Sequence, residues 1–193
     1  MTLILTRQEL ERGRLKFNRL LKEKLFIYPT DTIYGLGCNA ENENLVERLR
    51  ELKEQFMRPL SIIPPGMNWI KENCVLTPLA KEWLKRLPGP YTLIVKLKKR
   101  AVASNVDLGT NMVGVRLPDH WFLEWVKQLG VPIVTTSVNC PGSDFMTSID
   151  SLPDSIKKGT DFIVYEGEIK GSPSSLVDVT MRLKRQMLKR ATV

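Results

Sequence analysis

The chain has 193 residues, a length that fits one domain over residues 1–193 with a buried core and no covalent cross-links. Its contents of 42% hydrophobic and 26% charged residues are ordinary for a soluble globular protein. No apolar run reaches the roughly 18 to 20 residues that a membrane-spanning helix needs, and the net charge of +8 favours anionic partners such as nucleotides or RNA.

A capping box near the start of the chain predicts a first helix, because Thr6 is followed three residues later by Glu9. Apolar residues then continue at helical spacing in spite of Gly13, at Leu10, Leu15, Phe17, Leu20 and Leu21. We expect a buried strand at residues 25–28 and a second helix at residues 44–53. The apolar face of that second helix would carry Leu45, Val46, Leu49 and Leu52.

Strands and helices follow in mixed order along the rest of the chain. A helix opens at Thr77, with Pro78 in its first turn, and residues 88–90 stop it. Another helix starts at Pro118-Asp119 and carries Trp121, Phe122, Trp125 and Leu129. Strand-like runs cover residues 60–63, 91–97, 112–117, 132–136, 162–165, 176–180 and 183–188. Because the alternation is not strict, we expect an α/β or α+β fold around one twisted mixed sheet flanked by helices.

The segment from Tyr28 to Ala40, YPTDTIYGLGCNA, is rich in groups that can bind a ligand. A strand runs into Pro29, which cannot donate a hydrogen bond and tends to end strand pairing. Two threonines, an aspartate, a tyrosine and a Gly-Leu-Gly turn follow. Hydroxyls and backbone amides so concentrated could hold a small polar ligand; the alternative is an ordinary turn that tolerates polar residues.

Several common site types are not expected. Cys38, Cys74 and Cys140 are odd in number and widely spaced, so they predict neither a disulfide framework nor a zinc site and fit a reducing cytoplasm. His120 is the only histidine and is interpreted as a surface or capping residue, so a Ser–His–Asp triad is not expected. Gly35-Leu36-Gly37 lacks the third glycine of a dinucleotide-binding motif, and no phosphate-binding P-loop occurs. The N-terminal apolar segment is too short for a secretory signal.

Two further positions suggest a site. Ser137 and Asn139 follow a strand-like run, where a loop at the end of a sheet could present them to a ligand or where they could simply form the turn. Arg116 lies in an otherwise apolar strand-like run. A buried guanidinium needs an anionic partner, so packing alone does not explain this arginine.

Six sequence blocks in order resemble the YrdC/TsaC family, the threonylcarbamoyl-AMP synthases of tRNA modification. The blocks are Tyr28–Ala40, Lys53 with Arg58-Pro59-Leu60-Ser61, Pro88–Thr92, Val113–Pro118, Pro132–Asn139 and Pro173–Asp178. Together they extend over about residues 25 to 180. The resemblance implies a YrdC-like fold with a concave, positively charged sheet face.

The resemblance also implies a reaction in which L-threonine, bicarbonate and ATP give threonylcarbamoyl-AMP and pyrophosphate. Mg²⁺ would enter with ATP, held mostly by phosphate oxygens and water rather than by a protein metal site. A downstream tRNA threonylcarbamoyl transferase would be a partner, and tRNA or double-stranded RNA could contact the protein. The implied site residues are Lys53 and Arg58 as catalytic residues at the ATP phosphates, Ser137 and Asn139 at the nucleotide, and Thr32, Arg116, Thr135 and Ser174 around threonine.

The chain departs from the family pattern next to Lys53. The family usually has Lys-x-Arg there, whereas Gln55 occupies the arginine position and the segment to Arg58 is one residue shorter. Glutamine supplies no positive charge for a triphosphate. Either Arg58 substitutes for the missing arginine, or ATP binds more weakly. Met112 is a smaller departure, at a position where the family often has threonine.

These departures leave two alternatives to the synthase. The first is an RNA-binding YrdC-like protein whose ATP chemistry is weakened or lost. Two clusters of basic residues could bind RNA in such a protein, or they could be only solvated faces. The first is Lys96, Lys98, Lys99 and Arg100; the second is Arg182, Lys184, Arg185, Lys189 and Arg190. The second is a carbamoyl-transfer domain, ranked last because the chain lacks the acylphosphatase and zinc-finger-like segments of the larger carbamoyltransferases. Any cover over the site would have to come from local loops.

Overall fold

The computed structural model describes residues 2–180 and 187–188, in which eleven strands form one mixed sheet. This confirms the expected mixed α/β class. Along the sheet the order is β1 (Leu3–Leu5), β9 (Phe162–Val164), β2 (Phe26–Tyr28), β3 (Gly35–Gly37), β8 (Ile133–Ser137), β4 (Ser61–Ile63), β7 (Met112–Val115), β6 (Tyr91–Leu97), β10 (Ser175–Asp178) and β11 (Met187–Leu188). A short strand, β5 (Cys74–Val75), also pairs with β6.

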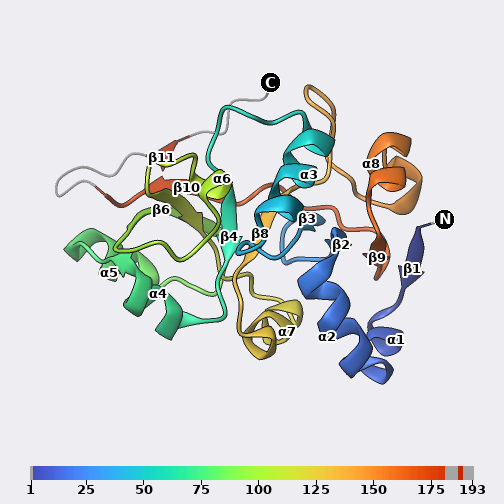
Figure 1. The fold of residues 1–193 in the computed structure, drawn as a ribbon, viewed down its shortest axis with the longest axis horizontal. Helices are drawn as coiled ribbons and strands as arrows, with labels where there is room; N and C mark the ends of the chain where they lie inside the picture. The colour runs from blue at the N-terminus through green and yellow to red at the C-terminus, as the bar shows by residue number, and fades with distance from the viewer. Residues whose placement is uncertain (1, 181–186, 189–193) are drawn as a thin grey trace.

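Helices cover both sides of the central strands. Figure 1 shows α3 on one side of β4 and β8, and α7 with α2 on the other. The helices are α1 (Arg7–Arg12), α2 (Arg14–Glu23), α3 (Glu43–Lys53), α4 (Met67–Asn73), α5 (Pro78–Leu84), α6 (Ser104–Asp107), α7 (Phe122–Leu129) and α8 (Asp154–Gly159), with a 3₁₀ turn at Ile149–Ser151. As expected, α5 begins after Thr77, whose hydroxyl accepts a hydrogen bond from the backbone N–H of Ala80.

The first predicted helix is wrong in one respect, because it breaks into α1 and α2 at Gly13. A Cβ at Gly13 would lie 2.6 Å from the ring of Phe17, so the absence of a side chain at Gly13 lets this ring pack against the backbone. The expected capping box is present, with Thr6 and Glu9 bonded to each other. Leu15, expected on the apolar face, is 89% exposed.

Three other expectations need correction or completion. The helix expected from Pro118 begins only at Phe122, because residues 119–121 form a turn in which the Phe122 N–H donates to Nδ1 of His120. The Gly-Leu-Gly turn is in fact strand β3, which returns antiparallel to β2. Of the strand expected at residues 183–188, residues 187–188 form β11, and the others lie outside the described part of the chain, as do the basic residues of the 182–190 cluster.

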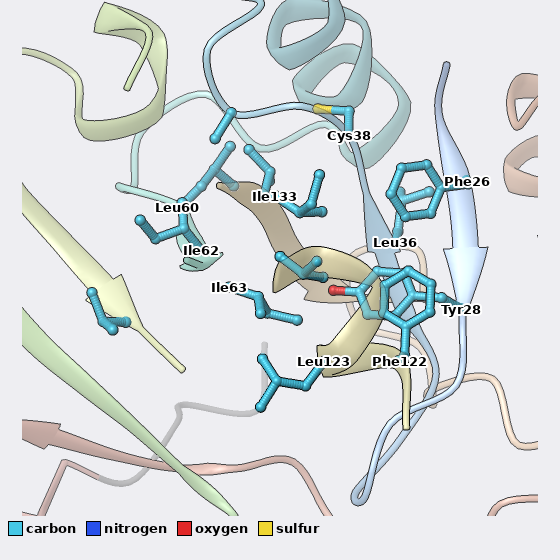
Figure 2. Close-up of a cluster of buried hydrophobic side chains, with 14 of the residues drawn as sticks. Phe26, Tyr28, Leu36, Cys38, Leu60, Ile62, Ile63, Phe122, Leu123 and Ile133 are labelled. Carbon is cyan, nitrogen blue, oxygen red and sulfur yellow. The ribbon is translucent and has the colours of Figure 1, made fainter. Parts of the chain in front are cut away.

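The core beneath the sheet is built around aromatic rings. Tyr28 of β2 stacks on Phe122 of α7 with a centroid distance of 4.4 Å, and Phe26 stacks on Phe162 of β9 at 5.4 Å. Figure 2 shows the Tyr28 and Phe122 rings lying against each other, next to aliphatic side chains from the neighbouring elements. Tyr28 and Phe122 are therefore both held in place by the buried apolar side chains around them.

Replacing Phe122 with alanine tests this core. Because the ring is fully buried, we expect Phe122→Ala to lower the free energy of unfolding by about 3 to 5 kcal/mol. Phe56→Ala is the control, since Phe56 is 51% exposed and its loss should change stability by less than about 0.5 kcal/mol. Urea unfolding of both variants measures the difference, and similar losses would contradict the packing described here.

Candidate active site

A buried arginine lies at the centre of the site. Arg116 directly follows β7, and only 5% of it is exposed. Its Nη2 donates to Oδ1 of Asp31, to Oγ1 of Thr32 at 2.6 Å and to Oγ1 of Thr30 at 3.2 Å. Nε of Arg116 is buried and has no hydrogen-bond partner among the described residues. The guanidinium thus has the anionic partner that its burial requires, while one of its nitrogens stays unsatisfied.

The loop between β2 and β3 presents these three partners. Thr30 Oγ1 accepts hydrogen bonds from the backbone N–H groups of Thr32 and Ile33 and donates to the carbonyl of Ile33. Such a side-chain-to-backbone turn fixes the loop without a helix or strand. Behind it, a Cβ at Gly171 would lie 1.7 Å from the carbonyl oxygen of Thr32, so only glycine lets the segment before β10 approach this loop.

Arg116 is one wall of a small recess, which is lined by residues from six strands or strand ends. The lining residues are Ile33, Tyr34, Gly35, Ser61, Thr92, Arg116, Thr135, Thr136, Ser137 and Ser174. The hydroxyls of Thr92 and Ser174 are 2.7 Å apart, and Tyr28 donates to Oγ1 of Thr135 at 2.7 Å. Burial raises the pKa of Tyr28, so its phenol stays protonated and remains a donor.

A wider cleft adjoins the recess, with a volume of about 550 Å³. It is lined by Gln55, Arg58, Pro59, Leu60, Ser61, Ile94, Met112, Val113, Gly114, Thr135, Thr136, Ser137 and Leu176. Ser61 and the end of β8, residues 135–137, line both spaces. The recess and the cleft therefore share one wall, formed where β4 pairs with β8.

At one end of this wall Lys53, Ser137 and Asn139 are joined by hydrogen bonds. Nζ of Lys53 donates to Oδ1 of Asn139 at 2.8 Å and to the Asn139 carbonyl, while Ser137 Oγ donates to the same Oδ1 at 2.7 Å. Lys53 is 5% exposed, and this burial lowers the pKa of its ammonium to about 8. A buried cation with only neutral partners can gain much from an incoming anion.

The structure brings most of the sequence-predicted site residues together in two groups. Arg116, Thr135 and Ser174 line the recess, and Thr32 is hydrogen-bonded to Arg116. Lys53 contacts Asn139, which contacts Ser137 at the shared wall. Arg58 belongs to neither group; it is exposed and lines the cleft beside Gln55.

Sequence reasoning gave no role to Thr30, Asp31, Ser61 and Thr92, although all four lie in the motif blocks. Asp31 could have been found from its place between two threonines, once Arg116 was known to need an anionic partner. Ser61 and Thr92 carried no such signal. They reach the recess through strand register, because Ser61 pairs with Thr135 and Thr92 stands next to Leu93, the partner of Val115.

The described residues offer neither a clustered metal site nor a membrane-spanning helix. No group of three or more His, Cys, Asp or Glu side chains there could hold a metal ion. In the same residues no helix is long and apolar enough to cross a membrane.

Comparison with known proteins gives the family. Residues 18–191 match the model of the Sua5/YciO/YrdC family, whose description is telomere recombination. This chain belongs to that family. It is 34% identical over 164 residues to a Methanocaldococcus jannaschii protein provisionally named threonylcarbamoyl-AMP synthase, a match that covers 83% of this chain and 76% of the relative. It is also 31% identical to the threonylcarbamoyl-AMP synthase of Vibrio vulnificus, covering 86% and 94% of the two chains.

Among solved structures, Pyrococcus abyssi Sua5 in complex with L-threonine matches this Sua5/YciO/YrdC chain with a TM-score of 0.80 and 29% identity. The match covers 93% of this chain but 54% of the Sua5 chain, so the protein spans about half the length of that relative. The recognition of the YrdC/TsaC family from sequence blocks is thereby confirmed, as is the family's fold.

Removing the Arg116 side chain should cost more than removing an exposed arginine of the same kind. Arg116→Gln leaves Asp31, whose side chain is only 13% exposed, without its cation, so we expect a loss of about 3 to 5 kcal/mol in the free energy of unfolding. Arg7→Gln breaks the exposed pair with Glu11 and should cost less than about 1 kcal/mol. Equal losses in urea unfolding would mean that the Arg116 cluster does not hold the loop in place.

Proposed function

We propose that this protein is a threonylcarbamoyl-AMP synthase, which converts L-threonine, bicarbonate and ATP into threonylcarbamoyl-AMP and pyrophosphate. The observation that carries the proposal is the shared wall, because it places a small recess with a buried guanidinium directly beside a cleft of nucleotide size. The names of the Vibrio vulnificus and Methanocaldococcus jannaschii relatives support it. The product would serve the threonylcarbamoyladenosine modification of tRNA.

The recess suits L-threonine. The threonine carboxylate would bind the Arg116 guanidinium, whose planar fork matches a carboxylate and whose Nε is unsatisfied in the free protein. The hydroxyls of Thr32, Thr135 and Ser174 lie close enough to this arginine or to the recess to bind the remaining polar groups of the amino acid. The complex of Pyrococcus abyssi Sua5 with L-threonine supports L-threonine as the ligand.

The cleft suits ATP. Lys53 would supply positive charge to the phosphates, and Ser137 and Asn139, which it contacts, would bind the nucleotide. Arg58, on the cleft wall, would add a second charge at the phosphates in place of the arginine that Gln55 replaces. Mg²⁺ would arrive with ATP and be held by phosphate oxygens and water.

The chemistry needs alignment more than acid–base groups. The threonine amine adds to the carbon of CO₂, which bicarbonate supplies, and loses a proton to give a carbamate. A carbamate oxygen then attacks the α-phosphorus, the bond from that phosphorus to the bridging oxygen breaks, and pyrophosphate leaves with the electron pair. The side chains of the shared wall would align the reactants, while the buried cations Lys53 and Arg116 would stabilise the developing negative charge.

Gln55 favours one other candidate, a protein that binds RNA and has lost part of its ATP chemistry. Gln55 lines the cleft where the family usually has an arginine, and the net charge of +8 suits a polyanion. RNA affinity that falls steeply with salt, without threonine-dependent turnover of ATP, would favour this candidate.

Pyrophosphate release from ATP tests the two candidates. With Mg²⁺ present, we expect release only when both L-threonine and bicarbonate are added. Lys53→Met should lower the rate at least about 100-fold because it removes charge from the phosphates. Lys71→Met is the matched control, since Lys71 is exposed on α4, whereas Lys53 is buried and hydrogen-bonded to Asn139 next to the shared wall. Pyrophosphate release that does not depend on threonine would contradict the synthase proposal, and so would the absence of release by folded protein.

The lowered pKa of Lys53 predicts how ATP binding depends on pH. Because the free protein has a Lys53 pKa of about 8 instead of the usual 10.5, its ammonium is lost as the pH rises through 8. The affinity for Mg-ATP should therefore fall between about pH 8 and pH 9.5, where an ordinary lysine stays charged. Lys53→Arg, charged throughout, should show a level affinity by calorimetry. Parallel curves for the two proteins would show that Lys53 does not control the dependence.

A further inference from the structure

Arg50 is the largest side chain among the fully buried residues of the described chain, with 2% exposed. It lies on α3, three residues before Lys53. Burying a guanidinium is costly unless its donors are satisfied, and arginine is seldom found this deep in a small protein. The sequence reasoning did not single this residue out.

Backbone carbonyls satisfy every donor of Arg50. Nε donates to the carbonyl of Asn105 at 2.6 Å, Nη1 to those of Gln55 at 2.7 Å and Arg58 at 3.1 Å, and Nη2 to those of Arg58 at 3.1 Å and Val106 at 3.3 Å. A guanidinium has five N–H groups, and these bonds use all of them. Arg50 thus has no donor left for a ligand.

The carbonyls belong to two segments, of which the first lines the cleft. Gln55 and Arg58 open and close the loop after α3, and both side chains line the cleft. Asn105 and Val106 belong to α6, and the Val106 carbonyl also accepts the backbone N–H of Leu60. Through these bonds the Arg50 guanidinium links the loop at residues 55–58 to α6.

The backbone N–H of Gln55 also holds the start of the loop, because it donates to the Arg50 carbonyl at 3.0 Å, but the side chains at the centre of the loop do not. Phe56 is 51% exposed and Met57 is 89% exposed, so neither side chain fastens it to the core. At its start the backbone leaves α3 through Glu54, whose φ of 49° is left-handed. An exposed loop with so little packing would sample many conformations if its carbonyls lost their common donor.

We propose that Arg50 is a positioning residue, which holds the loop at residues 55–58 so that Arg58 faces the nucleotide. This deepens the synthase proposal and rests on it, since the nucleotide of that reaction is the ligand concerned. Arg50 would act by fixing the position of the loop; its own positive charge would not contact the nucleotide. It would compensate for Gln55 by fixing the position from which Arg58 can reach the phosphates.

Arg50→Lys separates position from charge. Lysine keeps the positive charge but has only three N–H donors on a single nitrogen, which cannot span four carbonyls. We expect faster hydrogen–deuterium exchange of the amides in residues 55–60, and a KM for ATP at least five times that of the wild type. The KM for L-threonine should stay within twofold of the wild-type value, because none of residues 55–58 lines the recess. Leu49→Val is the control, since it perturbs the buried face of α3 without touching a loop carbonyl.

Each outcome decides something. Unchanged exchange of residues 55–60 in Arg50→Lys would overturn the positioning role, and so would equal exchange increases in Leu49→Val. Faster exchange with an unchanged KM for ATP would overturn the link to the nucleotide. Wild-type protein without threonine-dependent pyrophosphate release would overturn the synthase proposal instead, while the exchange data would still decide whether Arg50 holds the loop.

Discussion

Strand β8 pairs antiparallel with β3 on one side and with β4 on the other. This double pairing puts Ser137 beside Gly35 and Thr135 beside Ser61, so that three distant parts of the chain meet at one place in the sheet. Close approach is essential: a Cβ at Gly37 would lie 2.5 Å from the carbonyl oxygen of Val134. Both the recess and the cleft depend on this arrangement, because the end of β8 is their common wall.

The two spaces differ in how their cations are satisfied. Arg116 already has three hydrogen-bonded side chains around one nitrogen, and one of them, Asp31, is acidic. Lys53 has only the neutral Asn139, and its pKa is lowered as a result of burial. A carboxylate that binds at Arg116 must share it with Asp31, which favours a small and well-shaped ligand. Phosphates at Lys53 meet no such competitor, so the cleft suits a larger and more highly charged one.

Much of the fold and of the site could be predicted from sequence, and the reasons are local. Capping at Thr6 and Thr77 and the apolar spacing of α3 set element positions that the structure confirms. The break at Gly13 could not be predicted, because it depends on how the ring of Phe17 packs. β3 was missed because two glycines usually indicate a turn, whereas here they admit the ring of Tyr28 and a neighbouring strand.

Among the site residues too, local sequence indicates some positions, and only tertiary contacts reveal others. The roles proposed for Arg116, Ser137 and Asn139 came from motif blocks; in the structure Arg116 and Ser137 line the recess, and Asn139 is hydrogen-bonded to Ser137. Arg50 could not be found in this way, since its partners are backbone carbonyls from segments about 50 residues apart, and carbonyls leave no trace in a sequence. The place of the loop after Lys53 is likewise a property of tertiary structure.

A crystal structure with L-threonine and a non-hydrolysable ATP analogue would test the central claim most directly, namely that one wall aligns two ligands. The account predicts the threonine carboxylate on Arg116, and the α-phosphate beside the end of β8, within hydrogen-bond reach of Lys53. A nucleotide bound away from the cleft would contradict the account, and so would a threonine whose amine points away from the α-phosphate.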